Sequence, residues 1–100
     1  MFSRGPKAVD AAPGDEYAKF LQEAAAILGT SADDLEISKE LQSGYGCDEL
    51  EVIELIQIAE DLWGTSLVPN AFNVEDAQRA TRKFRTLRDI VNEAQLEQPH

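Results

Sequence analysis

The segment from Asp48 to Gly64 constrains the fold more than any other part of this sequence. Its apolar residues recur at intervals of three and four, which is the period of an amphipathic α-helix. Asp48 and Glu51 have the spacing of a capping box, and Gly64 is suited to a left-handed helix end. The apolar stripe of this predicted helix consists of Val52, Leu55, Ile56, Ala59, Leu62 and Trp63.

A second amphipathic pattern precedes the first one and begins at Asp15. We expect Asp15 to cap the start of this helix and Gly29 to end it, because glycine adopts the left-handed conformation without strain. The apolar residues of the pattern occupy one face of the predicted helix: Tyr17, Phe20, Leu21, Ala24 and Leu28.

Residues 30–46 form a long connection between these two predicted helices. Ser31 and Asp34 have the spacing of a capping box, which predicts a single helical turn. A connection of this length without regular structure is uncommon and is often functional. Three apolar residues separated by polar ones are expected to hold the connection against the core: Leu35, Ile37 and Leu41.

Two further helices are predicted toward the C-terminus. Residues 74–82 favour a short helix, and Thr86 and Asp89 form a capping box for a last helix that runs to about Gln95. No stretch alternates with period two, so strands are not supported. We therefore predict an all-α four-helix bundle with a short third helix and a long first loop. The apolar stripe of the last helix is Leu87, Ile90, Val91 and Ala94.

The length of 100 residues is that of one domain, predicted here over residues 15–96. Residues 1–14 are rich in glycine and proline and predict a flexible tail, and residues 97–100 predict a disordered end. No segment resembles a signal sequence or approaches the roughly 20 apolar residues that cross a bilayer. The single cysteine, Cys47, excludes an internal disulfide and favours a reducing compartment, so we expect a cytoplasmic protein.

The net charge of −10 arises from 19 acidic residues against 9 basic ones. Such a surface repels phosphate backbones and anionic lipid, which argues against nucleic acid and membrane insertion. A protein with a basic surface is the natural partner, and we expect this chain to be a monomer by itself. Catalysis is not supported, because the only histidine is the terminal His100 and no nucleophile–base pair or metal-ligand cluster is present.

Two charged runs stand out from the remaining sequence. Neither run is interrupted by a residue of opposite charge, so each is either a solvated surface or a contact for an oppositely charged partner. The acidic run consists of Asp48, Glu49, Glu51, Glu54, Glu60 and Asp61. The basic run consists of Arg79, Arg82, Lys83, Arg85 and Arg88, which could alternatively pair with the acidic helices or contact phosphate.

The start of the strongest helix resembles the second helix of acyl carrier proteins, where the usual wording is Gly-x-Asp-Ser-Leu. The matching run is Tyr45-Gly46-Cys47-Asp48-Glu49-Leu50, followed by Glu51, Ile53, Glu54, Leu55 and Ile56. The run Glu60, Asp61, Trp63, Gly64, Ser66 and Leu67 is similar to the family's Glu-Glu-x-Phe-Gly and isoleucine ending. The resemblance covers roughly residues 15–95 and implies the four-helix fold of that family.

Glu49 stands where the family attaches 4′-phosphopantetheine to a serine. Attachment requires a hydroxyl, whereas an ionised carboxylate only accepts hydrogen bonds, so we predict that the arm is absent. Two alternatives stay open: a carrier modified at Ser43 or Cys47, and a bundle that binds lipid non-covalently. The resemblance implies an apolar space that shelters an acyl chain, and ordinary core packing is the other interpretation of its residues: Leu50, Ile53, Ile56, Ile58 and Ala59.

The leading hypothesis is an acyl-carrier-like domain that lacks the carrier chemistry and acts as a docking or regulatory partner. The resemblance implies acyl-processing enzymes of lipid or polyketide metabolism as its partners. An acidic helix face would steer such a basic partner and raise its association rate. The residues predicted to dock are Asp48, Glu51, Glu54, Glu60 and Asp61.

Overall fold

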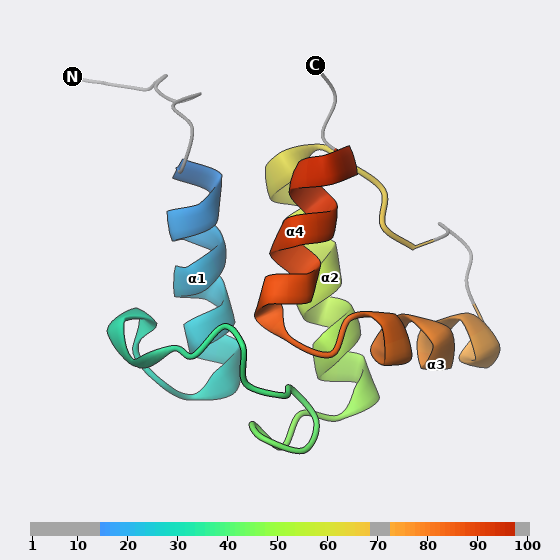
Figure 1. The fold of residues 1–100 in the computed structure, drawn as a ribbon, viewed down its shortest axis with the longest axis horizontal. Helices are drawn as coiled ribbons and strands as arrows, with labels where there is room; N and C mark the ends of the chain where they lie inside the picture. Colours follow the sequence, from blue (N-terminus) through green and yellow to red (C-terminus); the bar gives the residue numbers. More distant parts are fainter. Residues whose placement is uncertain (1–14, 69–72, 98–100) are drawn as a thin grey trace.

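The computed structural model describes residues 15–68 and 73–97 (Figure 1). These residues form four α-helices and a short 3₁₀ turn, and they contain no strand. The all-α prediction is therefore confirmed, with α3 as the shortest helix at 10 residues. The elements are α1 (Asp15–Leu28), the 3₁₀ turn η2 (Ala32–Asp34), α2 (Glu49–Trp63), α3 (Val74–Lys83) and α4 (Leu87–Glu97).

Helix α2 begins at the predicted capping box. The Glu51 N–H donates to the Asp48 carboxylate over 2.8 Å, and the Asp48 N–H donates to the Glu51 carboxylate over 3.0 Å. The two side chains thus satisfy backbone groups that have no partner within the helix. This prediction is confirmed.

Glycine ends both α1 and α2, as predicted. Gly29 and Gly64 have positive φ angles of 75° and 64°, in the region that other residues rarely adopt. In each case the next residue donates its N–H back to a carbonyl in the last turn, from Thr30 to Ala25 and from Thr65 to Glu60. These bonds satisfy carbonyls at the helix ends.

Two local predictions at the start of the domain need correction. Asp15 is the first residue of α1, so it lies inside the helix rather than just before it. Ser31 precedes the predicted helical turn, but its hydroxyl donates to the Asp34 carboxylate over 3.0 Å and caps no backbone N–H. The turn forms as a 3₁₀ helix, in which three residues suffice.

The C-terminal half contains one expected and one additional capping box. Thr86 and Asp89 exchange the predicted bonds at the start of α4, each over 3.1 Å. Asn73 and Asp76 form an equivalent pair at the start of α3. Helix α4 continues to Glu97, beyond the predicted end and into the segment predicted to be disordered. The predicted tail over 1–14 and residues 98–100 lie outside the described residues.

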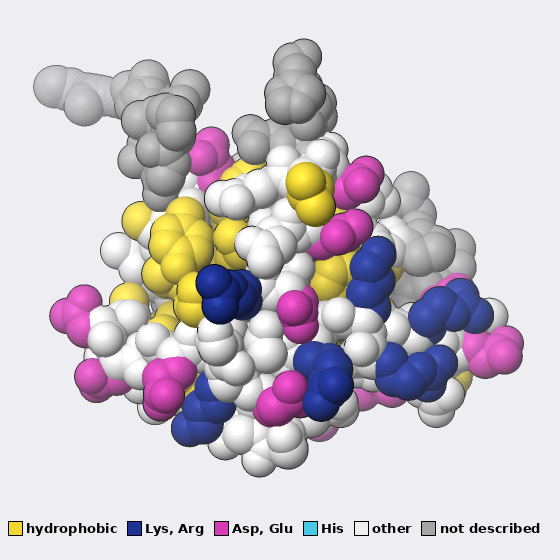
Figure 2. Space-filling view, in the orientation of Figure 1, with side chains coloured by type: hydrophobic (Ala, Val, Ile, Leu, Met, Phe, Trp, Pro, Cys, Tyr) yellow, Lys and Arg dark blue, Asp and Glu magenta, His cyan; other side chains and the backbone are white. Residues whose placement is uncertain are grey.

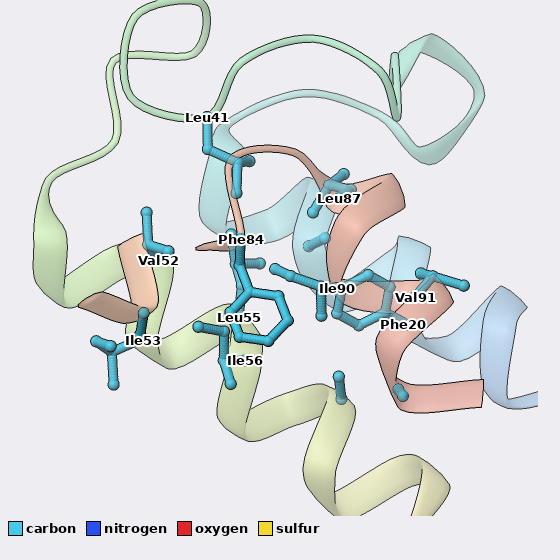
Figure 3. Packing of buried hydrophobic residues seen from close by; sticks show 14 of the residues in the cluster. Phe20, Leu41, Val52, Ile53, Leu55, Ile56, Phe84, Leu87, Ile90 and Val91 are labelled. Atoms are coloured by element: carbon cyan, nitrogen blue, oxygen red, sulfur yellow. The ribbon is translucent and has the colours of Figure 1, made fainter. Parts of the chain in front are cut away.

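Helix α2 is the central element, since it packs against α1, α3 and α4. The three longer helices run alongside one another, and α3 lies roughly across them at one end (Figure 1). Side chains from α1, α2, α4 and the α3–α4 connection converge on one core (Figure 3). The rings of Phe20 and Trp63 meet edge to face with centroids 5.7 Å apart. None of the helices in the described residues has the length and apolarity needed to cross a bilayer.

The predicted stripes of α2 and α4 face this core. Every member of the two stripes is buried except Leu62, which is partly buried against the others. In α1, Phe20 and Ala24 are fully buried and the rest of the stripe lies at the edge of the core. The helix period alone therefore identified the inward faces.

The long connection after α1 is tied to the joint between α3 and α4. Leu41 is fully buried, and its N–H donates to the Arg85 carbonyl over 2.8 Å. The Arg88 N–H donates to the Ile37 carbonyl over 3.0 Å, and both Leu35 and Ile37 pack partly buried against the core. The prediction that these three apolar residues hold the connection is confirmed.

Candidate functional site

The face of α2 opposite the core carries a row of exposed side chains. Leu50, Glu54, Gln57 and Asp61 are spaced by four, three and four residues, which places them on one face of a helix. We call this row the outward ridge. Leu50 is 78% exposed, whereas the other apolar side chains of α2 are buried or half-buried. The ridge therefore combines two carboxylates, one amide and one apolar side chain.

The other three residues predicted to dock are engaged by the backbone. Asp48 and Glu51 form the capping box of α2. The Glu60 carboxylate accepts the Leu67 N–H over 2.7 Å and the Val68 N–H over 3.0 Å. Glu60 thus holds the chain that leaves α2, so only Glu54 and Asp61 of the predicted five lie on the ridge.

Glu49 is the first residue of α2 and is half-buried. A carboxylate in the first helical turn interacts favourably with the positive end of the helix dipole. Its side chain has no hydroxyl that could form a phosphodiester. The residue therefore suits a helix start and cannot serve as the attachment residue that the family resemblance would place there.

The two alternative attachment residues lie in different environments. Cys47 is only 7% exposed, and its pKa is raised to about 11 by burial and, to a lesser degree, by the Glu51 and Asp48 carboxylates. Its thiol is therefore neutral at physiological pH and is a weak nucleophile. Ser43 is exposed on the turn that precedes Gly44, so its hydroxyl is accessible to an enzyme.

The residues predicted to line an apolar space occupy three environments. Ile53, Ile56 and Ala59 are buried in the core, Ile58 is half-buried at its edge, and Leu50 faces solvent on the ridge. Their positions agree with core packing for the first three residues. An acyl-binding space stays a prediction.

The basic run is exposed along α3 and the start of α4, where Lys and Arg side chains gather in Figure 2. Arg79 pairs with Asp76 over 3.1 Å, Lys83 with Glu93 over 3.4 Å, and Arg85 with Glu40 over 3.1 Å. The acidic partners lie in α3, in α4 and in the connection before α2, so none of these ion pairs is made with the acidic residues of α2.

The remaining two arginines make no ion pair within the described ranges. Arg88 donates to the Ser38 hydroxyl over 3.3 Å. Arg82 lies in the last turn of α3, exposed to solvent. The run is therefore only partly neutralised by its surroundings.

Sequence reasoning missed the composition of the ridge because it grouped residues by charge. The sequence interpretation places Leu50 in an apolar space and does not include Gln57, although both lie on the same face as Glu54. The signal was present: these residues recur with helical spacing opposite the apolar stripe. No family model matches this sequence, and no curated protein matches it significantly.

Proposed function

We propose that this chain is a protein-docking domain of acyl-carrier type that carries no 4′-phosphopantetheine and binds its partner through the outward ridge of α2. The observation that supports this proposal most directly is the ridge itself. Glu54 and Asp61 are exposed on it, and α2 contains no basic residue that could neutralise them. A partner with a basic groove would complement this face.

Leu50 is the apolar residue of the proposed docking surface. An exposed leucine gains about 1.5–3 kcal/mol when a partner buries it fully, whereas exposed carboxylates mainly increase the association rate. The ridge thus has one residue suited to affinity and two suited to steering. Leu50 lies at the N-terminal end of the ridge, so a partner could bury it while the carboxylates farther along the helix contact basic groups.

Glu49 supports the absence of the arm, since it replaces the hydroxyl that attachment requires. The resemblance to acyl carrier proteins supplies the class of partner, namely enzymes that process acyl groups. In this proposal the chain keeps the docking surface of a carrier and acts as a structural or regulatory subunit.

The docking proposal is tested by reversing the charge of the ridge. The double variant Glu54→Arg/Asp61→Arg should lose the partner proteins that the parent chain retains from an extract of its source organism. The matched control is Glu23→Arg/Glu97→Arg, which changes the net charge equally at exposed residues outside the ridge. Glu51 is unsuitable for this test because its carboxylate also accepts the Asp48 N–H in the capping box of α2.

The retained partner is then purified, and its dissociation constant is measured at low and high salt. The proposal requires weaker binding by the ridge variant, by Leu50→Asp, and by the parent chain at high salt. Equal affinity of the parent, the ridge variant and the control would refute it.

A working carrier modified at Ser43 is the second candidate, because Ser43 is exposed whereas Cys47 is buried. Intact mass after incubation with coenzyme A and a broad-specificity phosphopantetheinyl transferase separates the two proposals, with a standard carrier protein as the positive control. No added mass supports the armless domain. An added arm that Ser43→Ala abolishes would establish the carrier instead.

A further inference from the structure

A surface recess of about 300 Å3 lies between the turn at residues 40–44 and the end of α3. This volume is at the lower end of the range for small-molecule sites. The recess is separate from the outward ridge, because no ridge residue lines it. All of the residues that line it have polar or charged side chains: Glu40, Gln42, Ser43, Thr81, Arg82 and Arg85.

The two walls of the recess are held together by the backbone. The buried Leu41 donates its N–H to the Arg85 carbonyl over 2.8 Å, which joins the turn to the chain that follows α3. The turn is closed by the N–H groups of Gly44 and Tyr45, which donate to the Glu40 carbonyl over 2.9 and 3.0 Å. A Cβ at Gly44 would lie 2.5 Å from that carbonyl oxygen, so this turn requires glycine. The recess is therefore preformed.

The charges in the recess favour an anion. Arg85 donates from Nε to the Glu40 carboxylate over 3.1 Å, and this bond does not use its two terminal nitrogens. Arg82 makes no ion pair with any residue that the structure describes. The lining residues thus carry two guanidinium groups and one carboxylate, in a chain whose net charge is −10.

We propose that this recess binds the phosphate group of a small phosphorylated ligand. The planar guanidinium groups of Arg82 and Arg85 present N–H donors in the geometry that phosphate oxygens accept. Ser43 and Gln42 supply neutral donors on the opposite wall, whereas the Thr81 hydroxyl already donates to the Gln78 carbonyl over 2.9 Å. A phosphate has several oxygens and can use donors from both walls at once. The large negative net charge disfavours a nucleic acid as the source of that phosphate.

The test is a titration of the full chain with inorganic phosphate, followed by amide NMR at neutral pH and constant ionic strength. Saturable shifts should concentrate on residues 40–44 and 81–86. Arg82→Gln should weaken binding by about tenfold, because it removes a charged donor. Arg79→Gln is the matched control, since it removes the same charge from the same helix outside the recess.

Unchanged amide spectra away from the substituted residue would show that each variant folds as the parent does. Shifts that do not saturate, that chloride reproduces, or that Arg82→Gln and Arg79→Gln weaken equally would overturn the proposal. The ridge variant Glu54→Arg/Asp61→Arg should still bind phosphate. This result separates the recess from the docking proposal, so either proposal can fail while the other stands.

Discussion

The acidic run around α2 and the basic run at residues 79–88 are both series of like charges without an opposite charge between them. Their side chains nevertheless make different contacts in the folded chain. Three acidic side chains of the first run accept hydrogen bonds from backbone N–H groups. Three cations of the second run instead pair with single carboxylates at the surface. The comparison shows that the density of charge in a sequence does not reveal which charges hold the fold.

The physical reason lies in what each charge replaces. A backbone N–H at a helix start or in a turn has no partner within the element. A carboxylate that accepts its hydrogen bond therefore removes the free-energy cost of an unsatisfied donor. A surface lysine or arginine is already well solvated, and an exposed ion pair gains at most about 1 kcal/mol. We therefore expect the acidic run to carry larger effects than the basic run.

The largest expected effect concerns Cys47, which is close enough to the Asp48 and Glu51 carboxylates for both to raise its pKa. Its pKa of about 11, against an ordinary 9.0, predicts about a hundredfold less thiolate at neutral pH than in the unfolded chain. Alkylation should be slower in the native protein than in urea by about one to two orders of magnitude, because a thiolate of higher pKa is also a somewhat stronger nucleophile. Because the folded state holds the proton more tightly, its contribution to stability is complete below pH 9.0 and is lost as pH rises toward 11.

The same alkylation measurement, made on variants of the neighbouring acidic residues, shows how much their carboxylates raise the pKa of Cys47. Glu51→Gln should lower the pKa of Cys47 and speed alkylation at a given pH, while Glu54→Gln, on the ridge, serves as the control. Similar alkylation rates in the native and urea-unfolded parent chain would show that burial does not protect this thiol.

The second effect is the loss of the Glu60 carboxylate. Glu60→Ala leaves the Leu67 and Val68 N–H groups without this acceptor and should lower the free energy of unfolding by about 2 kcal/mol. Glu60→Gln keeps one oxygen and should cost less. Urea denaturation measures both, and Asp61→Ala should change stability by less than about 0.5 kcal/mol. Equal losses in the free energy of unfolding for Glu60→Ala and Asp61→Ala would show that the hydrogen bonds to the Glu60 carboxylate do not stabilise the fold.

The third effect is the helix cap of α2. Asp48→Ala should cost about 1 kcal/mol, because the Glu51 N–H loses its side-chain acceptor. Asp48→Asn should retain most of the stability, since asparagine caps helices as well as aspartate does. Thermal unfolding of both variants, with Glu54→Ala as control, decides the matter. Equal unfolding midpoints for Asp48→Ala and Glu54→Ala would show that the Asp48 cap does not stabilise the protein.

The smallest effect is expected in the basic run. A double-mutant cycle on Arg85→Gln and Glu40→Gln should give a coupling free energy of about 0.5 kcal/mol, because both side chains are substantially exposed. The coupling should decrease further in high salt. A coupling free energy above about 2 kcal/mol would make this ion pair as stabilising as the carboxylates that accept backbone N–H groups. The two runs would then not differ in their contribution to stability.

Much of the fold was predictable because its signals are local. The capping boxes at Asp48 and Thr86 join residues three apart, and Gly29 and Gly64 end their helices through their own backbone freedom. The pair Asn73 and Asp76 carries the same signal and marks the start of α3 at Val74, where the sequence also predicts it. The apolar stripes were equally readable from the helix period.

The candidate sites were less predictable because they depend on distant parts of the chain. Charge alone grouped Glu60 with Asp61, although only the path of the chain after α2 brings the Leu67 N–H to the Glu60 carboxylate. The partners Glu40 and Arg85 are 45 residues apart, and no local pattern relates them.

The sequence by itself determined the starts of α2 and α4, the ends of α1 and α2, and which helix faces turn inward, since hydrogen bonds and side-chain neighbours three or four residues apart decide these features. Only the tertiary structure decided which charges are free to bind. Packing of the connection against the α3–α4 joint buries Leu41, and it places Ser43 and Arg82 on opposite walls of one recess. Such contacts depend on how the helices pack together, because packing brings together residues that are far apart in the chain.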